Sequence, residues 1–154
     1  MTENLTVADR IGVGIVSGLI GTVVMTLGQK AEMALTKRPP SATPAKAVEK
    51  MAQVDLDGED EQRASTPIHF AYGTALGGAL ALLDEVPEPA RTASFFALAY
   101  GGGAALLSGL KLAPLPTEQK PAEVATDLGH HLVYALSAGA AYALLTRFVE
   151  RSRA

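Results

Sequence analysis

Four stretches of the chain carry no charged side chain, and they determine the predicted architecture. They are residues 11–29, 64–83, 92–110 and 128–146, and every Asp, Glu, Lys and Arg lies outside them. Each stretch is about 20 residues long and, as a helix, would cross the hydrocarbon core of a bilayer. A soluble helical bundle, the alternative, would carry charges on nearly every turn of its wet faces. The pattern therefore predicts an all-α integral membrane protein with four spans, in one domain over residues 1–154.

The second and fourth stretches resemble each other, which indicates an internal repeat. Residues 69–83 read HFAYGTALGGALALL, and residues 131–145 return 62 positions later as HLVYALSAGAAYALL. The alignment has no gap and pairs His69 with His131, Tyr72 with Tyr134, and Gly77 with Gly139. Shared Ala, Gly and Leu could follow from composition, but the shared His and Tyr positions favour a duplication.

The first and third stretches match more weakly, at a separation of 81 positions. The matching positions pair Gly21, Gly28 and Lys30 with Gly102, Gly109 and Lys111. We therefore predict a four-helix bundle of two related hairpins, about residues 7–83 and 92–147. Each unit would contain two spans, so both copies would enter the membrane from the same side as a parallel repeat. His69 and His131 would then lie at one depth.

Two polar loops, residues 30–63 and 111–127, join the spans within the hairpins. In the first loop, the prolines of the KRPPSATP cluster interrupt helical structure. Residues 44–52, PAKAVEKMA, predict a short amphipathic helix suited to a membrane interface. The acidic run of residues 55–61 is interpreted as a solvated loop, with a cation site as the alternative. Eight Lys and Arg residues on the loop side against five on the other favour cytoplasmic loops.

Glycines within the apolar stretches predict close helix packing. Gly14 and Gly18 have GxxxG spacing, which lets helix backbones approach closely in lipid. We interpret this spacing as packing within the monomer, with a homodimer seam as the alternative. The triplet 101–103 predicts another close crossing or a local kink. The remaining packing positions are Gly21, Gly73, Gly77 and Gly139.

Composition narrows the function classes. The chain has no cysteine, which excludes disulfides and thiolate metal sites. A net charge of −3 without a basic stripe argues against nucleic acid as a partner. The N-terminal sequence MTENLTVADR lacks the basic start of a cleaved signal peptide, so the first stretch is expected to be a retained helix. No nucleophile motif, phosphate loop or zinc spacing is present, and we expect no enzymatic activity.

The candidate site consists of His69, Tyr72, His131 and Tyr134. In each copy His and Tyr are three residues apart and share a helix face. Their plainest role is interfacial, with His near the helix start and Tyr in the aromatic belt. The sharper hypothesis is a histidine pair that faces the bundle axis, because ionisable residues in lipid indicate function. Such a pair would relay protons, or hold a metal or haem.

Three weaker candidates lie near the same predicted surface, namely His130, Glu32 and Asp127. From these residues we predict a small membrane protein that supports the passage of protons, ions or small solutes. The alternatives are a haem- or metal-binding bundle that uses the His pair, and a structural or accessory subunit. The sequence assigns no cofactor. The predicted partners are the lipid bilayer, a second copy in a homodimer, or a larger membrane complex.

The order of elements also resembles a known family. A helix, a loop with Arg38-Pro39-Pro40, a short helix and a His/Tyr/Gly helix follow one another within 154 residues. This layout is similar to that of the YagU-like small bacterial inner-membrane proteins. The resemblance implies a multi-pass protein of the bacterial inner membrane, linked to acid tolerance, and supplies no catalytic residues. The acidic run of residues 55–61 is a departure from that layout.

Overall fold

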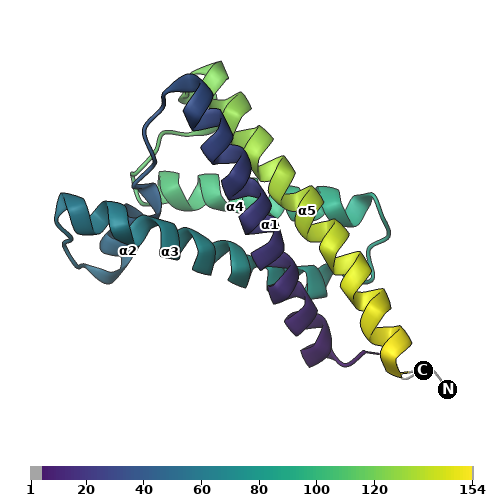
Figure 1. Cartoon of the computed structure of the whole chain (residues 1–154). Helices are drawn as coiled ribbons and strands as arrows, with labels where there is room; N and C mark the ends of the chain where they lie inside the picture. The colour runs from purple at the N-terminus through teal and green to yellow at the C-terminus, as the bar shows by residue number, and fades with distance from the viewer. Residues whose placement is uncertain (1–4, 154) are drawn as a thin grey trace.

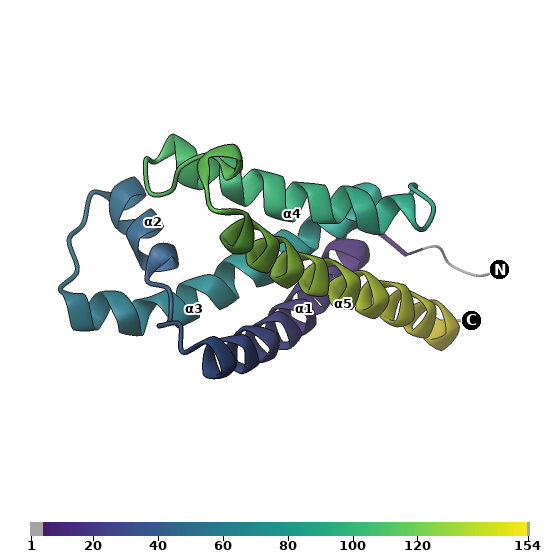
Figure 2. The same cartoon turned by 90° about the horizontal axis from the view of Figure 1, so that it is seen from above.

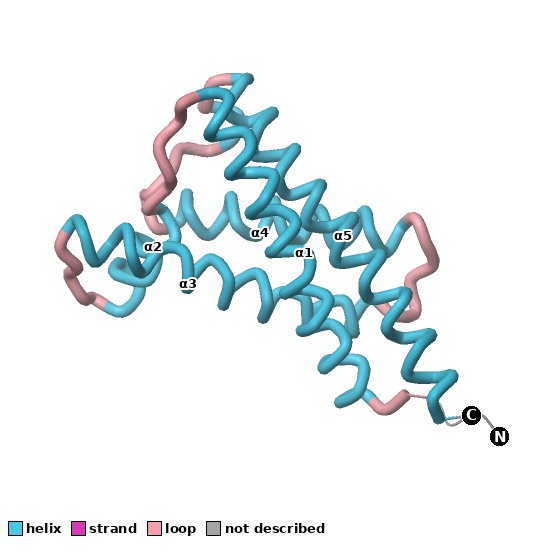
Figure 3. The backbone as a smooth tube through the Cα atoms, in the orientation of Figure 1, coloured by secondary structure: helices cyan, strands magenta, loops and turns pink. Residues whose placement is uncertain are grey.

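The computed structural model describes residues 5–153, in which all regular structure is helical, as the sequence predicts (Figure 3). The first four residues of the N-terminal segment discussed above lie outside this range. The elements, in chain order, are α1 (Val7–Thr36), α2 (Thr43–Ala52), α3 (Gly58–Gly77), the 3-10 helix η1 (Gly78–Leu83), α4 (Ala90–Gly109), the 3-10 turn η2 (Pro116–Glu118) and α5 (Pro121–Arg153).

Two long antiparallel helices, α1 and α5, lie side by side and form the centre of the molecule (Figure 1). The α3–η1 segment crosses α1, and α4 crosses α5 (Figure 1 and Figure 2). The start of α1 and the end of α5 meet at one end of the molecule, where Arg153 forms an ion pair with Asp9 at 2.7 Å. The loop after α1 turns back toward the bundle and places α2 against the start of α3.

The two faces of α1 have opposite compositions. Its buried residues are mostly small or polar and recur in pairs: Val13, Gly14, Ser17, Gly18, Gly21, Thr22 and Met25. The pairs between them are exposed, and all are large and apolar: Ile15, Val16, Leu19, Ile20, Val23 and Val24. This is the reverse of a helix in a water-soluble protein, which buries its large apolar side chains. The outer face of α1 is thus suited to an apolar solvent.

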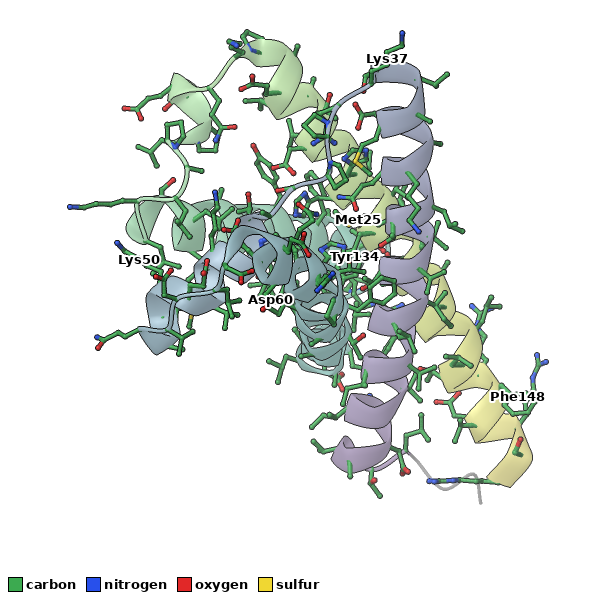
Figure 4. All side chains as sticks on the ribbon, turned by 60° about the vertical axis from the view of Figure 1, so that its left-hand side comes forward. Met25, Lys37, Lys50, Asp60, Tyr134 and Phe148 are labelled. Atoms are coloured by element: carbon green, nitrogen blue, oxygen red, sulfur yellow. The ribbon has the colours of Figure 1, made fainter. Side chains whose placement is uncertain are left out.

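Helix α5 repeats this arrangement. Its buried stretch is rich in Ala and Tyr, with Ala135 and Ala138 fully covered. Its exposed face carries Leu136, Leu144 and Phe148, and Figure 4 shows Phe148 pointing away from the other helices. Among the described residues, α1 and α5 are the two helices that are long and apolar enough to cross a membrane. In the most apolar 18 residues of each helix, only 39% of α1 and 33% of α5 is buried. The core helix of a soluble protein is mostly buried.

Local signals explain where the helices begin, and two predicted boundaries were wrong. Thr6 and Asp9 form a reciprocal capping box, and α1 begins at Val7 as predicted. The acidic run of residues 55–61, expected to be a loop, instead contains the start of α3. The side chain of Asp57 accepts from the backbone N–H of Asp60 and caps the helix. The acids of the first turn also interact favourably with the helix dipole.

Helix α5 begins six residues before the predicted start at Asp127, and its first residue is Pro121. Proline is compatible with the first helical turn because its missing N–H has no partner there in any case. The second polar loop is therefore shorter than predicted. The short helix α2 agrees with the prediction for residues 44–52.

Glycines allow the backbones of α1 and α3 to touch. A Cβ atom added to Gly18 would lie 2.7 Å from the carbonyl oxygen of Gly73 and 2.7 Å from the Cα of Gly77. One added to Gly14 would lie 2.6 Å from the carbonyl oxygen of Gly77. Two GxxxG spacings therefore pack against each other within one chain. The alternative of a homodimer seam at Gly14 and Gly18 is wrong, because this face is already covered.

The α4–α5 contact is made mainly by side chains. Phe95 packs on the Tyr134 ring at 5.4 Å between centroids, and Thr92 lies over Gly139. The triplet 101–103 does not form the close crossing that its sequence predicts. Added Cβ atoms at these three glycines would meet no atom within 4 Å in the described structure. The triplet also lies within the continuous helix α4, on a face that no other described element covers.

Candidate functional site

The four candidate residues lie on two helices far apart in sequence. His69 and Tyr72 lie on α3, and His131 and Tyr134 lie on α5. A hydrogen bond joins the two copies of the motif: the Tyr134 hydroxyl donates to the backbone carbonyl oxygen of Gly73, the residue after Tyr72, at 2.6 Å.

His131 is oriented by the preceding turn of its own helix. Its Nδ1 lies 2.9 Å from the backbone carbonyl oxygen of Asp127 and 3.2 Å from the Asp127 carboxylate. A carbonyl oxygen can only accept, so this hydrogen bond requires the proton to be on Nδ1. The neutral ring then presents Nε2 as an acceptor. Tyr100 of α4 holds the ring edge-on, with centroids 5.6 Å apart.

His69 has the less satisfied environment of the two. Its Nε2 is buried and has no hydrogen-bond partner among the described residues. The ring contacts Phe70 edge-on, with centroids 6.1 Å apart. A buried polar atom without a partner is costly, and it calls for an explanation in a ligand, a water or a proton carrier. Three hydroxyls of the described structure, on Thr26, Ser108 and Thr146, are also buried without a partner, and His69 Nε2 is the one atom of this kind that can take up a proton near neutral pH.

The two tyrosines, which the repeat pairs, have different environments. Tyr134 is 3% exposed, and its hydroxyl donates to the backbone carbonyl oxygen of Gly73 at 2.6 Å. Tyr72 is 45% exposed, with no hydrogen bond to its hydroxyl described. Tyr134 therefore connects α5 to the α1–α3 crossing, while Tyr72 lies at the rim. Figure 4 shows Tyr134 between the helices.

The three weaker candidates lie toward the polar loops, Glu32 near the end of α1, and Asp127 and His130 in the first three turns of α5. The Glu32 carboxylate accepts from Arg38 at 2.6 Å and from the hydroxyl of Thr36 at 2.9 Å. These hydrogen bonds, with Arg38 contributing most, lower the pKa of Glu32 below its ordinary value. Glu32 is thus held as an anion by partners at the end of its own helix.

The described residues give little support to a metal centre. In residues 5–153, no group of three or more His, Asp or Glu side chains is placed to share a metal ion. Asp127 interacts with His131 from the preceding turn of the same helix.

A second polar cluster lies at the opposite end of the bundle, and the sequence reasoning missed it. The Asp84 carboxylate forms ion pairs with Arg10 and Arg91, and it accepts from the Tyr142 hydroxyl at 3.0 Å. The Arg91 guanidinium lies over the Tyr142 ring, 5.5 Å from its centroid. Arg10 and Arg91 have the same separation of 81 positions as the weak repeat, a signal that would have linked them.

This cluster is structural in character. Its four members belong to α1, the connector after η1, α4 and α5, and so it ties three of the long helices to the end of the α3–η1 segment. Neighbouring Glu88 also contacts Arg91 and the backbone N–H of Thr92. Burial opposes ionisation here, but the hydrogen bonds from Thr92 and Arg91 outweigh it and lower the pKa of Glu88. The charges are thus paired where the helices leave the apolar stretches.

No protein-family model, curated protein or solved structure matches this chain. Function therefore has to be inferred from the residues themselves.

Proposed function

We propose that this chain is a multi-pass membrane protein with four spans. It would consist of two related hairpins and lie in a bacterial inner membrane, with the loops of residues 30–63 and 111–127 in the cytoplasm. The reversed faces of α1 and α5 support the proposal, because large apolar side chains face outward and small ones face inward. In lipid this arrangement leaves no apolar surface in water and lets the helices approach closely.

The other two spans would be α3 with η1, and α4. Residues 64–83 and 92–110 carry no charge, and the helical path of the first continues without a break from α3 into η1. The charged residues between these spans are paired with one another at Asp84, Glu88 and Arg91. Charges that meet at helix ends are compatible with a membrane boundary, where water satisfies their remaining hydrogen bonds.

Within this protein the histidine pair would relay protons across the membrane, on a path that begins at the loop side. The observation that carries this proposal is the buried Nε2 of His69, which has no hydrogen-bond partner among the described residues. An imidazole that donates through Nδ1 and accepts through Nε2 can take up a proton on one side and release one on the other. The negative charges of Asp127 and Glu32 would attract protons on the loop side. Movement of a small ion by the same groups is included in the proposal.

Proton flux into proteoliposomes that contain a pH-sensitive dye tests this role. His69→Ala and His131→Ala should each remove most of the flux. The double variant should lose little more, because groups that act as one unit are not additive. His130→Ala is the matched control, since its side chain is rotated about 100° from that of His131. Unchanged flux in both single variants would refute the role. A haem or metal spectrum in the purified protein would replace it with cofactor binding.

A second candidate function, an accessory subunit that packs on other membrane helices, has one observation in its favour. Every fourth residue on one face of α4 is small and exposed: Ala93, Ala97, Gly101, Ala105 and Gly109. The chain has no cysteine, so single-cysteine variants can report contacts at this face. Gly101→Cys should form cross-links in native membranes to a second copy or to another protein. Cross-links no more frequent than those of Leu136→Cys, on the outer face of α5, would exclude this candidate.

A further inference from the structure

Helix α2 is held against α3 at the point where the apolar stretch of α3 begins. Ala45 is fully buried, and Lys46 forms an ion pair with Glu61 at 3.6 Å. The Ser65 hydroxyl donates to the backbone carbonyl oxygen of Ser41 at 2.9 Å. Residue 64 is the first of the charge-free stretch. The contacts therefore place α2 level with the start of a proposed span.

The face of α2 that points away from α3 is apolar. Pro44, Ala47, Val48 and Met51 lie within one side of the helix by their spacing, and the Met51 side chain is 63% exposed. The exposed Lys50 lies off this side, about 110° around the helix from its middle. No described element covers the apolar side, although the molecule has folded the rest of α2 onto α3.

We propose that this apolar side of α2 lies in the boundary between lipid headgroups and acyl chains, on the loop side of the bilayer. The inference rests on the membrane placement proposed above. The occupant is the same bilayer that surrounds the spans, and α2 would lie on it as an amphipathic interfacial helix, with the Lys50 side toward water.

The size of the face favours lipid over a second protein. A helix of ten residues is about 15 Å long. Its exposed side cannot supply the roughly 800 Å² per partner that a stable protein interface buries. A bilayer does not require such an area, because α3 already holds α2 beside it. Insertion of a few side chains then costs no translational entropy.

The absence of tryptophan allows a direct test, because each single-Trp variant has one reporter. Met51→Trp, Lys50→Trp and Leu19→Trp are placed at exposed positions and reconstituted into vesicles of zwitterionic and anionic phospholipid. Lipids brominated near the headgroup quench nearby tryptophan. We expect about twofold quenching and a blue-shifted emission for Met51→Trp, and no quenching for Lys50→Trp. Leu19→Trp reports the depth of α1.

The outcomes separate the two proposals. Quenching of Leu19→Trp by lipids brominated deep in the chains, with Met51→Trp as unquenched as Lys50→Trp, would overturn the interfacial helix alone. The absence of quenching in Leu19→Trp would overturn the membrane placement and the interfacial helix together. Quenching of Met51→Trp and Lys50→Trp to the same extent would also refute the orientation of α2.

Discussion

The α1–α3 crossing brings backbone against backbone, whereas the α4–α5 contact is made by side chains. In the first, Gly14 and Gly18 meet Gly77, and no Cβ atom fits between the helices. In the second, Phe95 packs on Tyr134, and Gly139, the glycine of that contact, faces the side chain of Thr92 and not a backbone. Two hairpins that resemble each other in sequence therefore pack by different means.

The difference shows what a glycine contributes to an apolar helix. A glycine at a backbone crossing is required because no Cβ atom fits between the two helices. A larger residue there pushes the helices apart. The glycines of residues 101–103 face open space in the described structure. There a side chain meets nothing, and its added conformational restraint favours the helix. Spacing in sequence does not separate these two cases.

The largest expected effect is the contrast between Gly18→Ala and Gly102→Ala. The Cβ atom at Gly18 would lie 2.7 Å from backbone atoms of α3, which cannot rotate away. We expect Gly18→Ala to lower the free energy of unfolding in detergent by about 3 kcal/mol. Gly102→Ala should leave it unchanged or raise it by about 0.5 kcal/mol. Denaturant titration followed by circular dichroism measures both, and equal losses in the two variants would show that the crossings do not differ.

A smaller effect is expected for the two tyrosines. Tyr134→Phe removes a buried hydrogen bond to the carbonyl oxygen of Gly73, with an expected loss of about 1 kcal/mol of unfolding free energy. Tyr72→Phe should be close to neutral, since Tyr72 is half-exposed. The same titration checks this pair. If Tyr72→Phe proves the more damaging change, Tyr134 is not the link between the hairpins.

The smallest effect concerns pH at the end where α1 begins and α5 ends. Hydrogen bonds from Arg153 first, and then from Thr6, hold the pKa of Asp9 well below its ordinary value. A lowered pKa in the folded state means that the stabilisation is complete above the unfolded pKa of about 3.9 and is lost as the pH falls further.

Wild-type protein should therefore melt slightly higher than Asp9→Asn at pH 7, and the gap should close in acid. The pair is exposed, so added salt should also reduce the gap. Melting curves at several pH values test this expectation. A gap that grows as the pH falls would contradict the assigned cause of the pKa shift.

The helical fold follows from the sequence because its signals are local. The charge-free stretch of residues 11–29 was enough to predict α1 and its start near residue 7, and the helix continues to Thr36, beyond that stretch and into residues assigned to the polar loop. The start of α3 was missed because the acids of residues 55–61 were read by composition as a loop, although the Asp57 side chain caps the first turn. A run of acidic residues has the same composition whether it is a loop or a helix start. Asp57 can be recognised as a cap only once a helix is known to follow it.

The candidate site could be predicted only in part from the sequence. The shared spacing of the two His-x-x-Tyr motifs predicted a link between the second and fourth stretches, and the Tyr134 hydroxyl does bond to the backbone beside Tyr72, whereas the pairing of His69 with His131 stays a prediction. The unequal burial of the tyrosines depends on which helices pack against each of them. A sequence repeat does not show which helices those are. The cluster around Asp84 escaped notice because its members are scattered along the chain and stand at the ends of apolar stretches, where charges are ordinary.

The central claim is that the large apolar faces of α1 and α5 are covered by lipid. It is tested most directly by expressing the full chain in bacteria and washing the isolated membranes with alkaline carbonate. We predict that the protein stays in the washed membranes and becomes monodisperse only in detergent. Recovery of the full-length protein in the soluble fraction, monodisperse without detergent, would contradict the claim.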